Sequence, residues 1–406
     1  MIKNRNSHSL RWLYLAVGGV TLLFIGVIYA WSIFKVPLGQ AFQWSDSQLS
    51  LAYTLTMCFF CLGSLISGWL VKRLSLRTIL FISAAAILAG YVWTVNMNGS
   101  ILMLYLAYSA LIGGGVGIAY NTIVSLGNAW FPDKKGICSG IMMMCFGFST
   151  MVVGKVSARL FDVPQVGWQK TFLGLGVLIS LILVICAMVL KAPGAGANLP
   201  APKPARGRKE NFEQRDFSTR EMLRRPSFWI CYVYGTFHAA VGSAMFNFAG
   251  DVTKSFGATA AMATTLVSVL SICNGLGRVL CGLAFDYLGR KMAMFLSNVI
   301  TVLSPGIMLV ALAADSLPLA VVSICLAGLS YGTSPTISST FTAAFYGTRD
   351  FALNYSVTNT KLLFASFAAT VTSALLTATG TYMAPFALLL GLAVAAFVLN
   401  FFIRHP

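Results

Sequence analysis

Charged side chains are scarce in this sequence. Asp, Glu, Lys and Arg make up 10% of the 406 residues and only 11 residues are acidic, whereas hydrophobic residues reach 57%. A water-soluble domain of this size does not need so much apolar surface to fill its core. Segments of about 20 apolar residues recur along the chain, and each could cross a hydrocarbon layer of about 30 Å as a helix. The composition excludes a soluble catalytic domain and predicts an all-α integral membrane protein.

The residues of common catalytic and metal centres are also missing from the apolar segments. They contain no facing aspartates, no histidine-rich set and no nucleophile with a base. All nine cysteines fall in hydrophobic segments, where a thiol behaves as a small apolar side chain. Cys58 and Cys61 have C-x-x-C spacing but no second pair, which favours packing over a redox or metal role. We expect no disulfide, no metal, no cofactor and no enzymatic activity.

Twelve apolar segments are predicted to span the membrane. A cytoplasmic N-terminus puts 21 of the 28 lysines and arginines on inner segments, so the positive-inside rule predicts that both termini are cytoplasmic. The net charge of +17 is then a topology signal, and it does not indicate nucleic-acid binding. The predicted location is the plasma (inner) membrane. The expected spans are 12–34, 49–71, 79–97, 101–127, 137–159, 171–190, 227–250, 258–285, 292–313, 317–341, 353–376 and 384–403.

A polar connector, residues 191–226, interrupts the hydrophobic rhythm. It begins with proline, glycine and alanine and continues as a charged stretch. The interruption predicts an N-terminal bundle over residues 1–190 and a C-terminal bundle over 227–406, with six helices in each. Ser218 and Glu221 have capping-box spacing, so a short surface helix is expected in the connector, resting on anionic lipid headgroups.

A charged motif with glycines follows the eighth predicted span, from Gly282 to Lys291, and a degenerate copy follows the second, from Gly68 to Arg77. The copies start 214 residues apart, in equivalent places of the two halves, as expected for an internal repeat. The motif resembles the loop motif of the major facilitator superfamily, which implies two pseudo-symmetric six-helix bundles. Lys72 replaces the acid in the first copy. The gate-motif residues that this resemblance implies are Gly282, Asp286, Gly289, Arg290 and Arg73.

Three basic residues lie within predicted spans, which contain no deep acidic residue. Lys155 is near an outer end, where its stem can reach the headgroups. Arg278 and Lys361 both fall about 12 Å from the inner ends of their helices, at about 1.5 Å per residue. Extension of these two side chains to the cytoplasm is the alternative interpretation. Two unpaired cations at one depth indicate a binding site for an anion.

Four further stretches resemble the oxalate/formate antiporter family, which is related to the monocarboxylate transporters. They are Gly26–Pro37, Gly115–Tyr120, Trp130–Gly136 and Glu221–Trp229. In that family an arginine of helix 8 and a lysine of helix 11 face the substrate carboxylates. The resemblance assigns these roles to Arg278 and to Lys361. Lys361 comes one residue earlier than the family lysine, which turns a helical side chain by about 100° and leaves its direction open.

The resemblance also bears on the substrate. Ile28, Phe146 and Ala327 stand where the oxalate carriers have polar and aromatic groups, which favours one carboxylate with an apolar remainder. Asn274 lies one helical turn before Arg278, on the same helix face. Four aromatic residues are expected to line the cavity, with plain helix packing as the alternative for each. The predicted substrate-binding residues are Arg278, Lys361, Asn274, Tyr29, Trp31, Tyr120, Tyr331 and Asn359.

Proton coupling needs a titratable group, and Asn274 cannot serve. Monocarboxylate transporters have an aspartate at the equivalent position, where it is thought to handle a proton. His238, in the middle of the seventh span, is one candidate because an imidazole ordinarily titrates near neutrality. A fully hydrogen-bonded core histidine is the alternative interpretation of that residue. Lys361 is the second candidate for proton coupling.

The sequence therefore predicts a secondary active transporter of small monocarboxylates of the lactate and pyruvate class, working as a proton-coupled symporter by alternating access. Its expected partners are a small carboxylate, protons and membrane lipids, with no nucleic acid and no required oligomer. An oxalate/formate-type antiporter is the first alternative, because two uncompensated cations make an empty site costly to reorient. A transporter-like carboxylate sensor is the alternative from another class.

Overall fold

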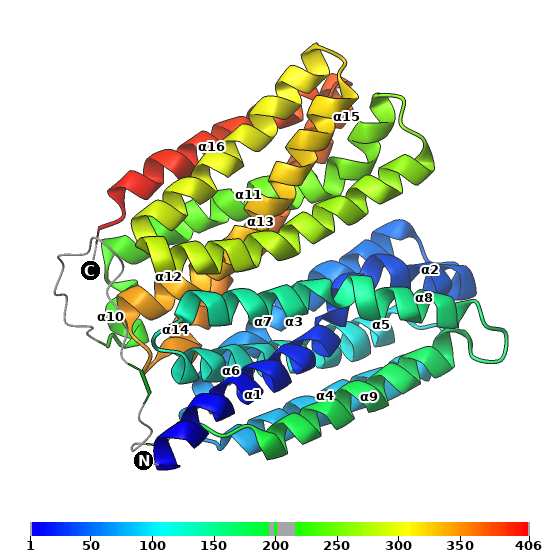
Figure 1. The fold of residues 1–406 in the computed structure, drawn as a ribbon. Helices are drawn as coiled ribbons and strands as arrows, with labels where there is room; N and C mark the ends of the chain where they lie inside the picture. Colours follow the sequence, from blue (N-terminus) through cyan, green and yellow to red (C-terminus); the bar gives the residue numbers. More distant parts are fainter. Residues whose placement is uncertain (1, 195–198, 201–215, 405–406) are drawn as a thin grey trace. The chain divides into compact units, whose positions relative to one another are not determined.

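A computed structural model describes residues 2–194, 199–200 and 216–404. Every regular element in these ranges is helical (Figure 1). Most of the predicted connector, namely residues 195–198 and 201–215, lies outside the described residues.

The first half of the chain is a series of membrane-length helices joined by short loops. Serine N-caps at Ser45, Ser75 and Ser100 accept hydrogen bonds from the first turns of α3, α4 and α5, and these caps fix where the helices begin. Short 3₁₀ (η1) and π-helical (η2, η3) stretches join several α-helices without a loop. The elements are α1 (Ile2–Ile25), η1 (Gly26–Ala30), α2 (Trp31–Phe42), α3 (Asp46–Leu70), α4 (Leu76–Val95), α5 (Ile101–Leu104), η2 (Tyr105–Gly113), α6 (Gly114–Trp130), α7 (Lys135–Ser149), η3 (Thr150–Gly154), α8 (Lys155–Phe161) and α9 (Gly167–Val189).

The second half begins with a short helix and continues with long ones. The elements are α10 (Thr219–Leu223), α11 (Pro226–Ser255), α12 (Ala260–Ala313), α13 (Leu317–Tyr346), α14 (Phe351–Asn359), α15 (Lys361–Thr379) and α16 (Met383–Phe402). Gly289 divides the 54-residue α12 into two helices, because its φ of 80° and ψ of 170° are not helical. Only glycine adopts such a conformation without strain, which explains its place in the repeated motif.

Ten helical segments in the described part of the chain are long and apolar enough to cross a membrane. One of them, Ala261–Ala313, contains the two helices that meet at Gly289. The 30-residue α11 is also long enough but is not among the ten. Counting α11 and both parts of α12 gives the twelve predicted segments. Lys155 is exposed at the start of α8, as its predicted extension toward the headgroups requires.

The chain forms two compact units. Unit 1 comprises Met1–Asp133, Cys145–Ala201 and Phe351–Ser356, and unit 2 comprises Lys134–Met144, Pro202–Asp350 and Val357–Pro406. The larger segments follow the predicted halves. Two short segments, at the start of α7 and in α14, belong to the unit that contains the other half of the chain. The domain boundaries at residues 190 and 227 stay predictions.

Unit 1 is held together by close helix contacts and one buried ion pair. α4 packs along α9, and α3 packs along α6 (Figure 1). A Cβ atom on Gly117 would lie 2.1 Å from the carbonyl oxygen of Phe60, so the absence of a side chain lets α3 and α6 touch. On α1, Arg11 forms a 2.7 Å ion pair with Asp133, and Arg11 is 1% exposed.

Unit 2 packs α12 against α13 and α11 against both α15 and α16. One of its apolar clusters includes Leu270, Met308, Ile324 and Phe386. The apolar faces of α11, α12, α13 and α16 meet in this cluster, which fixes these helices relative to each other.

The described end of the connector is tied to unit 2. Ser218 and Glu221 form the expected capping box at the start of α10. The Asp216 carboxylate accepts hydrogen bonds from the backbone N–H groups of Thr348 (2.9 Å) and Arg349 (3.2 Å), just after α13. The short helix therefore has a defined place on unit 2, and its contact with lipid headgroups stays a prediction.

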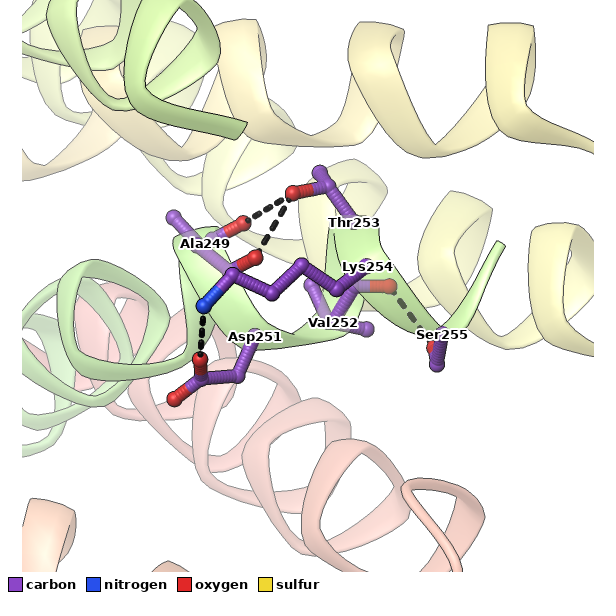
Figure 2. Close-up of polar contacts among 7 residues, drawn as sticks. Ala249, Asp251, Val252, Thr253, Lys254 and Ser255 are labelled. Carbon is purple, nitrogen blue, oxygen red and sulfur yellow. Dashed lines mark hydrogen bonds and ion pairs between the residues drawn. The ribbon is translucent and has the colours of Figure 1, made fainter. Parts of the chain in front are cut away.

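The last turns of α11 are polar. Figure 2 shows Lys254 paired with Asp251 and the Thr253 hydroxyl donating to the carbonyl oxygen of Ala249. The ion pair is 3.2 Å long, and the same hydroxyl also donates to the Gly250 carbonyl oxygen. Both members of the ion pair are more than half exposed, so the pair contributes little to stability. It extends α11 to Ser255, five residues beyond the predicted end of the seventh span.

Candidate functional site

Arg278 is a buried cation in the first part of α12. Arg278 is 7% exposed. Its Nη1 donates a hydrogen bond to the backbone carbonyl of Met143, which lies in the segment of α7 that belongs to unit 2. Nε is buried and has no hydrogen-bond partner. No carboxylate pairs with this guanidinium in the described ranges. An incompletely bonded buried cation is costly, and a bound anion would satisfy it.

Asn274 and Tyr331 lie near this guanidinium. Asn274 precedes Arg278 by one turn of α12, and its buried Oδ1 has no hydrogen-bond partner. Tyr331, on α13, is close enough for Arg278 to act electrostatically on its phenol. The Tyr331 ring packs against Phe246, with 5.2 Å between the ring centroids, and against Gly242. Asn274 and Tyr331 thus lie on the same helix as Arg278 and on the adjacent one, and their part in an anion site stays a prediction.

Glycines hold α12 and α13 together beside these residues. A Cβ atom on Gly277 would lie 2.2 Å from the carbonyl oxygen of Leu329, and one on Gly332 would lie 2.1 Å from that of Asn274. Such separations leave no room for any side chain. Because lipid supplies little hydrophobic drive for helix association, close backbone contact is the main source of attraction here. The backbone of Asn274 and Arg278 is thus fixed against α13.

Lys361 is the first residue of α15, directly after a break in the helix at Thr360. It is 3% exposed, its Nζ donates to the hydroxyl of Ser338 on α13, and its stem lies over Gly235 of α11. No carboxylate pairs with it within the described residues. Lys361 therefore points into unit 2 between α11 and α13, and does not extend to the cytoplasm.

The backbone of Arg278 and the amine of Lys361 meet α13 at similar levels. The Thr336 hydroxyl donates to the Arg278 carbonyl oxygen at 3.2 Å, and the Lys361 amine bonds to Ser338, two residues further along α13. Two residues correspond to about 3 Å along the axis and about 200° around it. The Arg278 backbone and the Lys361 amine therefore meet different faces of α13, and the similar depth of the two cations stays a prediction. Asn359, 4% exposed, ends α14 just before the break.

The predicted aromatic residues of unit 1 mostly make contacts within the fold. The Trp31 indole N–H donates to the Leu49 carbonyl oxygen at 2.8 Å, which uses its only donor. The Tyr120 hydroxyl is 2.9 Å from that of Tyr355, and Tyr29 packs edge-on against Phe146. We assign Trp31 to helix packing, whereas the phenols of Tyr29 and Tyr120 stay substrate-contact candidates. Ile28 and Phe146 are buried in unit 1, and Ala327 is buried in unit 2.

His238 lies inside unit 2 and is 1% exposed. Its Nε2 is 2.9 Å from the Ser297 hydroxyl and 2.9 Å from the Thr301 hydroxyl, both on α12. Its Nδ1 is buried with no hydrogen-bond partner. The ring is thus partly bonded, as a core histidine would be, but one nitrogen stays available.

The repeated motif forms a specific contact at its acidic residue. The Asp286 carboxylate accepts hydrogen bonds from the backbone N–H groups of Gly136 (2.9 Å) and Ile137 (2.8 Å), at the start of α7 and within unit 2. Gly282 allows this approach, since a Cβ there would lie 2.2 Å from the Gly136 oxygen. The guanidinium of Arg290 lies 4.9 Å from the Phe345 ring centroid. A carboxylate at a helix N-terminus is favoured by hydrogen bonding and by the helix dipole.

Replacing Asp286 by Asn tests this contact. The amide has one acceptor oxygen and would turn its NH₂ group toward a backbone N–H, so we expect a loss of about 1–3 kcal/mol in the stability of unit 2. Thermal unfolding of the purified protein in detergent measures it. Asp251→Asn, at the exposed pair of α11, is the matched control and should change the melting temperature little. Equal melting temperatures for the two variants would contradict the assigned role.

The residues that sequence reasoning missed are backbone carbonyls and common hydroxyls. Neither the Met143 carbonyl nor the hydroxyl of Ser338 was predicted to contact a cation. The segment 330–342 is rich in serine and threonine, and this enrichment was the available signal for Ser338. No sequence signal identifies a backbone acceptor.

Comparisons with known proteins agree with this architecture. The sequence model of the Major Facilitator Superfamily matches residues 15–250 and 233–406, which together are most of the chain. The chain belongs to the major facilitator superfamily. As a major facilitator protein with apolar helices throughout, it is a multi-pass membrane transporter. The superfamily and the all-helical fold, both predicted from the sequence, are confirmed.

Relatives of this major facilitator protein include two that align over most of its length. The oxalate:formate antiporter of Oxalobacter formigenes is 27% identical over 364 residues, 87% of this chain and 83% of the antiporter. The uncharacterized MFS-type transporter YhjX of Escherichia coli (strain K12) is 25% identical over 357 residues, 87% of this chain and 85% of YhjX. The predicted resemblance to the antiporter family therefore holds across the chain.

Solved structures show the same fold at low identity. The transporter FucP, in its outward conformation, superposes with a TM-score of 0.69 at 12% identity, covering 98% of this chain and 100% of FucP. A double tryptophan mutant of XylE gives a TM-score of 0.70 at 14% identity, covering 98% of this chain and 97% of XylE. These likenesses support the major facilitator fold, and the substrate has to be argued from the site.

Proposed function

We propose that this major facilitator protein is a secondary active transporter of small monocarboxylates of the lactate and pyruvate class, moving its substrate with a proton by alternating access. The observation that carries the proposal is the burial of Arg278 without an anionic partner among the described residues. Its guanidinium is buried, keeps an unpartnered Nε and has no acidic partner in the described part of the chain. A planar guanidinium matches a carboxylate with two parallel hydrogen bonds.

The residues at the family's substrate positions favour one carboxylate. Lys361 supplies a second positive charge, but its Nζ already donates to Ser338. A compact dianion also needs hydrogen bonds around its second carboxylate. The buried Ile28, Phe146 and Ala327 supply none, although all three are family substrate positions by resemblance. A small acid with an apolar remainder fits these residues better.

Exchange of carboxylates is the second candidate function. The antiporter of Oxalobacter formigenes is similar to this chain over most of its length. Two buried cations without acidic partners also favour exchange, because reorienting them without a bound anion would be costly. The same site could thus serve either function, and the coupling ion distinguishes them. Under both, we place the protein in the plasma (inner) membrane with cytoplasmic termini, on the asymmetry of its basic residues.

An imposed proton gradient separates the two functions. Purified protein is reconstituted into vesicles that contain no carboxylate, and the outside is acidified in the presence of labelled lactate. Symport predicts accumulation above the external concentration, which a protonophore abolishes. Uptake that occurs only when the vesicles are preloaded with a carboxylate would support exchange and contradict symport. Ligand-dependent thermal stabilisation without any transport would instead support a sensor.

A further inference from the structure

A cluster of buried hydroxyl groups surrounds His238 in unit 2. Ser297 and Thr301 on α12 contact its Nε2, and the Thr333 hydroxyl on α13 is 3.4 Å from the same atom. Thr301 continues the network to Ser330 at 2.6 Å. We call His238, Ser297, Thr301, Ser330 and Thr333 the hydroxyl cluster. All five are at most 6% exposed, so the network lies inside the bundle.

Several polar atoms beside the hydroxyl cluster are not fully bonded. Nδ1 of His238 has no hydrogen-bond partner, and the Asn298 amide and the Tyr234 hydroxyl, which interact with each other, have no further partner. Asn298 follows Ser297 on α12, and Tyr234 lies one turn before His238 on α11, near the Asn298 amide. Buried polar groups of this kind usually bind internal water. Because the set includes donors as well as acceptors, water suits it better than a metal cation, which accepts only lone pairs.

The hydroxyl cluster also lies beside Lys361. The Lys361 Nζ is above Gly235, since a Cβ there would come within 2.6 Å of it, and His238 follows Gly235 by three residues on α11. Residues three apart share a helix face and are separated by about 4.5 Å along the axis. Lys361 therefore acts electrostatically on His238. A proton on His238 adds a second positive charge at close range.

The other groups that face His238 carry no negative charge. The elements α12 and α13 present neutral hydroxyls, α11 presents the Tyr234 phenol, and α15 presents the Lys361 ammonium. No carboxylate contacts His238 in residues 2–194, 199–200 and 216–404. A proton on the ring is thus opposed first by burial and then by the charge of Lys361, and an anion at that lysine removes the second obstacle.

We propose that His238 and its hydroxyl cluster form a hydrated proton-carrying site that is coupled by charge to Lys361. When a substrate carboxylate neutralises Lys361, a proton from the bulk solution, relayed by internal water, adds to the free Nδ1 of neutral His238 and forms the imidazolium. When the carboxylate leaves, the imidazolium returns the proton to water on the other side of the membrane. Proton and carboxylate then assist each other's binding, as linkage requires. This inference rests on the proposed carboxylate transport and assigns its proton to His238.

The test compares two transport modes in the same vesicles. Exchange of labelled for unlabelled lactate needs no net proton movement, whereas gradient-driven accumulation does, and an internal pH-sensitive dye follows the proton. The variant His238→Gln keeps hydrogen-bonding capacity but cannot titrate. We expect it to retain exchange and to lose about fivefold or more of gradient-driven accumulation, together with the proton signal.

Three further variants keep the test decisive. Ser304→Ala removes another buried α12 hydroxyl, which bonds to the Ser323 carbonyl outside the hydroxyl cluster, and should leave both modes unchanged. If His238→Gln does not fold, Thr301→Val should reduce coupling while Thr301→Ser preserves it. Coupled accumulation by folded His238→Gln at the wild-type level would overturn the inference and leave symport standing. Exchange by the wild type without any gradient-driven accumulation, or accumulation without a proton signal, would overturn both.

Discussion

Replacing Arg278 by Ala should lower the initial rate of gradient-driven lactate uptake by about 100-fold or more. The substitution removes two charge-assisted hydrogen bonds, each worth about 1.5–3 kcal/mol, from a site where no other described side chain offers a planar pair of donors. Vesicles with equal amounts of reconstituted wild-type or variant protein measure the rate. Thermal stabilisation by lactate should disappear in parallel, because the anion loses its principal partner.

The same variant should remain folded. Arg278 has no acidic partner in the described part of the chain, so its removal leaves no unpaired buried charge behind. Taking an uncompensated cation out of the bundle should keep or raise the melting temperature of the empty protein. Low uptake with normal stability would assign the loss to the site, whereas normal uptake would refute a carboxylate site at Arg278.

Two substitutions calibrate this result. Arg278→Lys keeps the charge but loses the planar fork, and it should recover only part of the uptake. Lys155→Ala removes the exposed lysine of the predicted spans and should leave uptake unchanged. If Arg278→Lys transported lactate at the wild-type rate, a positive charge alone would suffice for binding, and the paired donors of the planar guanidinium would have no role.

The fold was largely predictable because the bilayer imposes it. Backbone groups in lipid must bond within their own segment, so long apolar runs can only become helices. Gly289 stood out in the sequence for its place in a charged motif, and it is where the helix breaks. The end of α11 was harder to predict, since the Asp251–Lys254 pair and Thr253 continue the helix with polar residues.

The two cations of the site were also predictable, because charge within a span is rare and requires a reason. Their partners were not. The hydroxyls of Ser338 and Thr342 both donate to carbonyl oxygens one turn back on α13, which is the ordinary behaviour of hydroxyls in helices. Nothing in the sequence shows that Ser338 also contacts Lys361 whereas Thr342 does not. The helix is interrupted at Thr360, so that α15 begins at Lys361. No proline or glycine near Thr360 predicts this interruption from the sequence.

The second large effect should come from Gly332→Ala, which adds one methyl group where α13 meets α12. The new Cβ would lie 2.1 Å from the Asn274 carbonyl oxygen and 3.1 Å from the Arg278 nitrogen. Both atoms are backbone, so the helices must separate. We expect a stability loss of about 1–3 kcal/mol, as for an overpacked core, seen as a lower melting temperature. Lactate binding should weaken as well, because Asn274 and Arg278 move with their backbone.

A matched control separates the local effect from glycine replacement in general. Gly391 of α16 has open space where a Cβ atom would lie, so Gly391→Ala should be neutral or slightly stabilising through its better helix propensity. Gly277→Ala, which meets the Leu329 carbonyl oxygen at the same crossing, should behave like Gly332→Ala. Reduced stability with unchanged lactate affinity at both crossing positions would show that α13 supports the fold without orienting Arg278. Loss of both properties at the crossing, with neither lost at Gly391, would mean that the glycine contacts hold the carboxylate site in place.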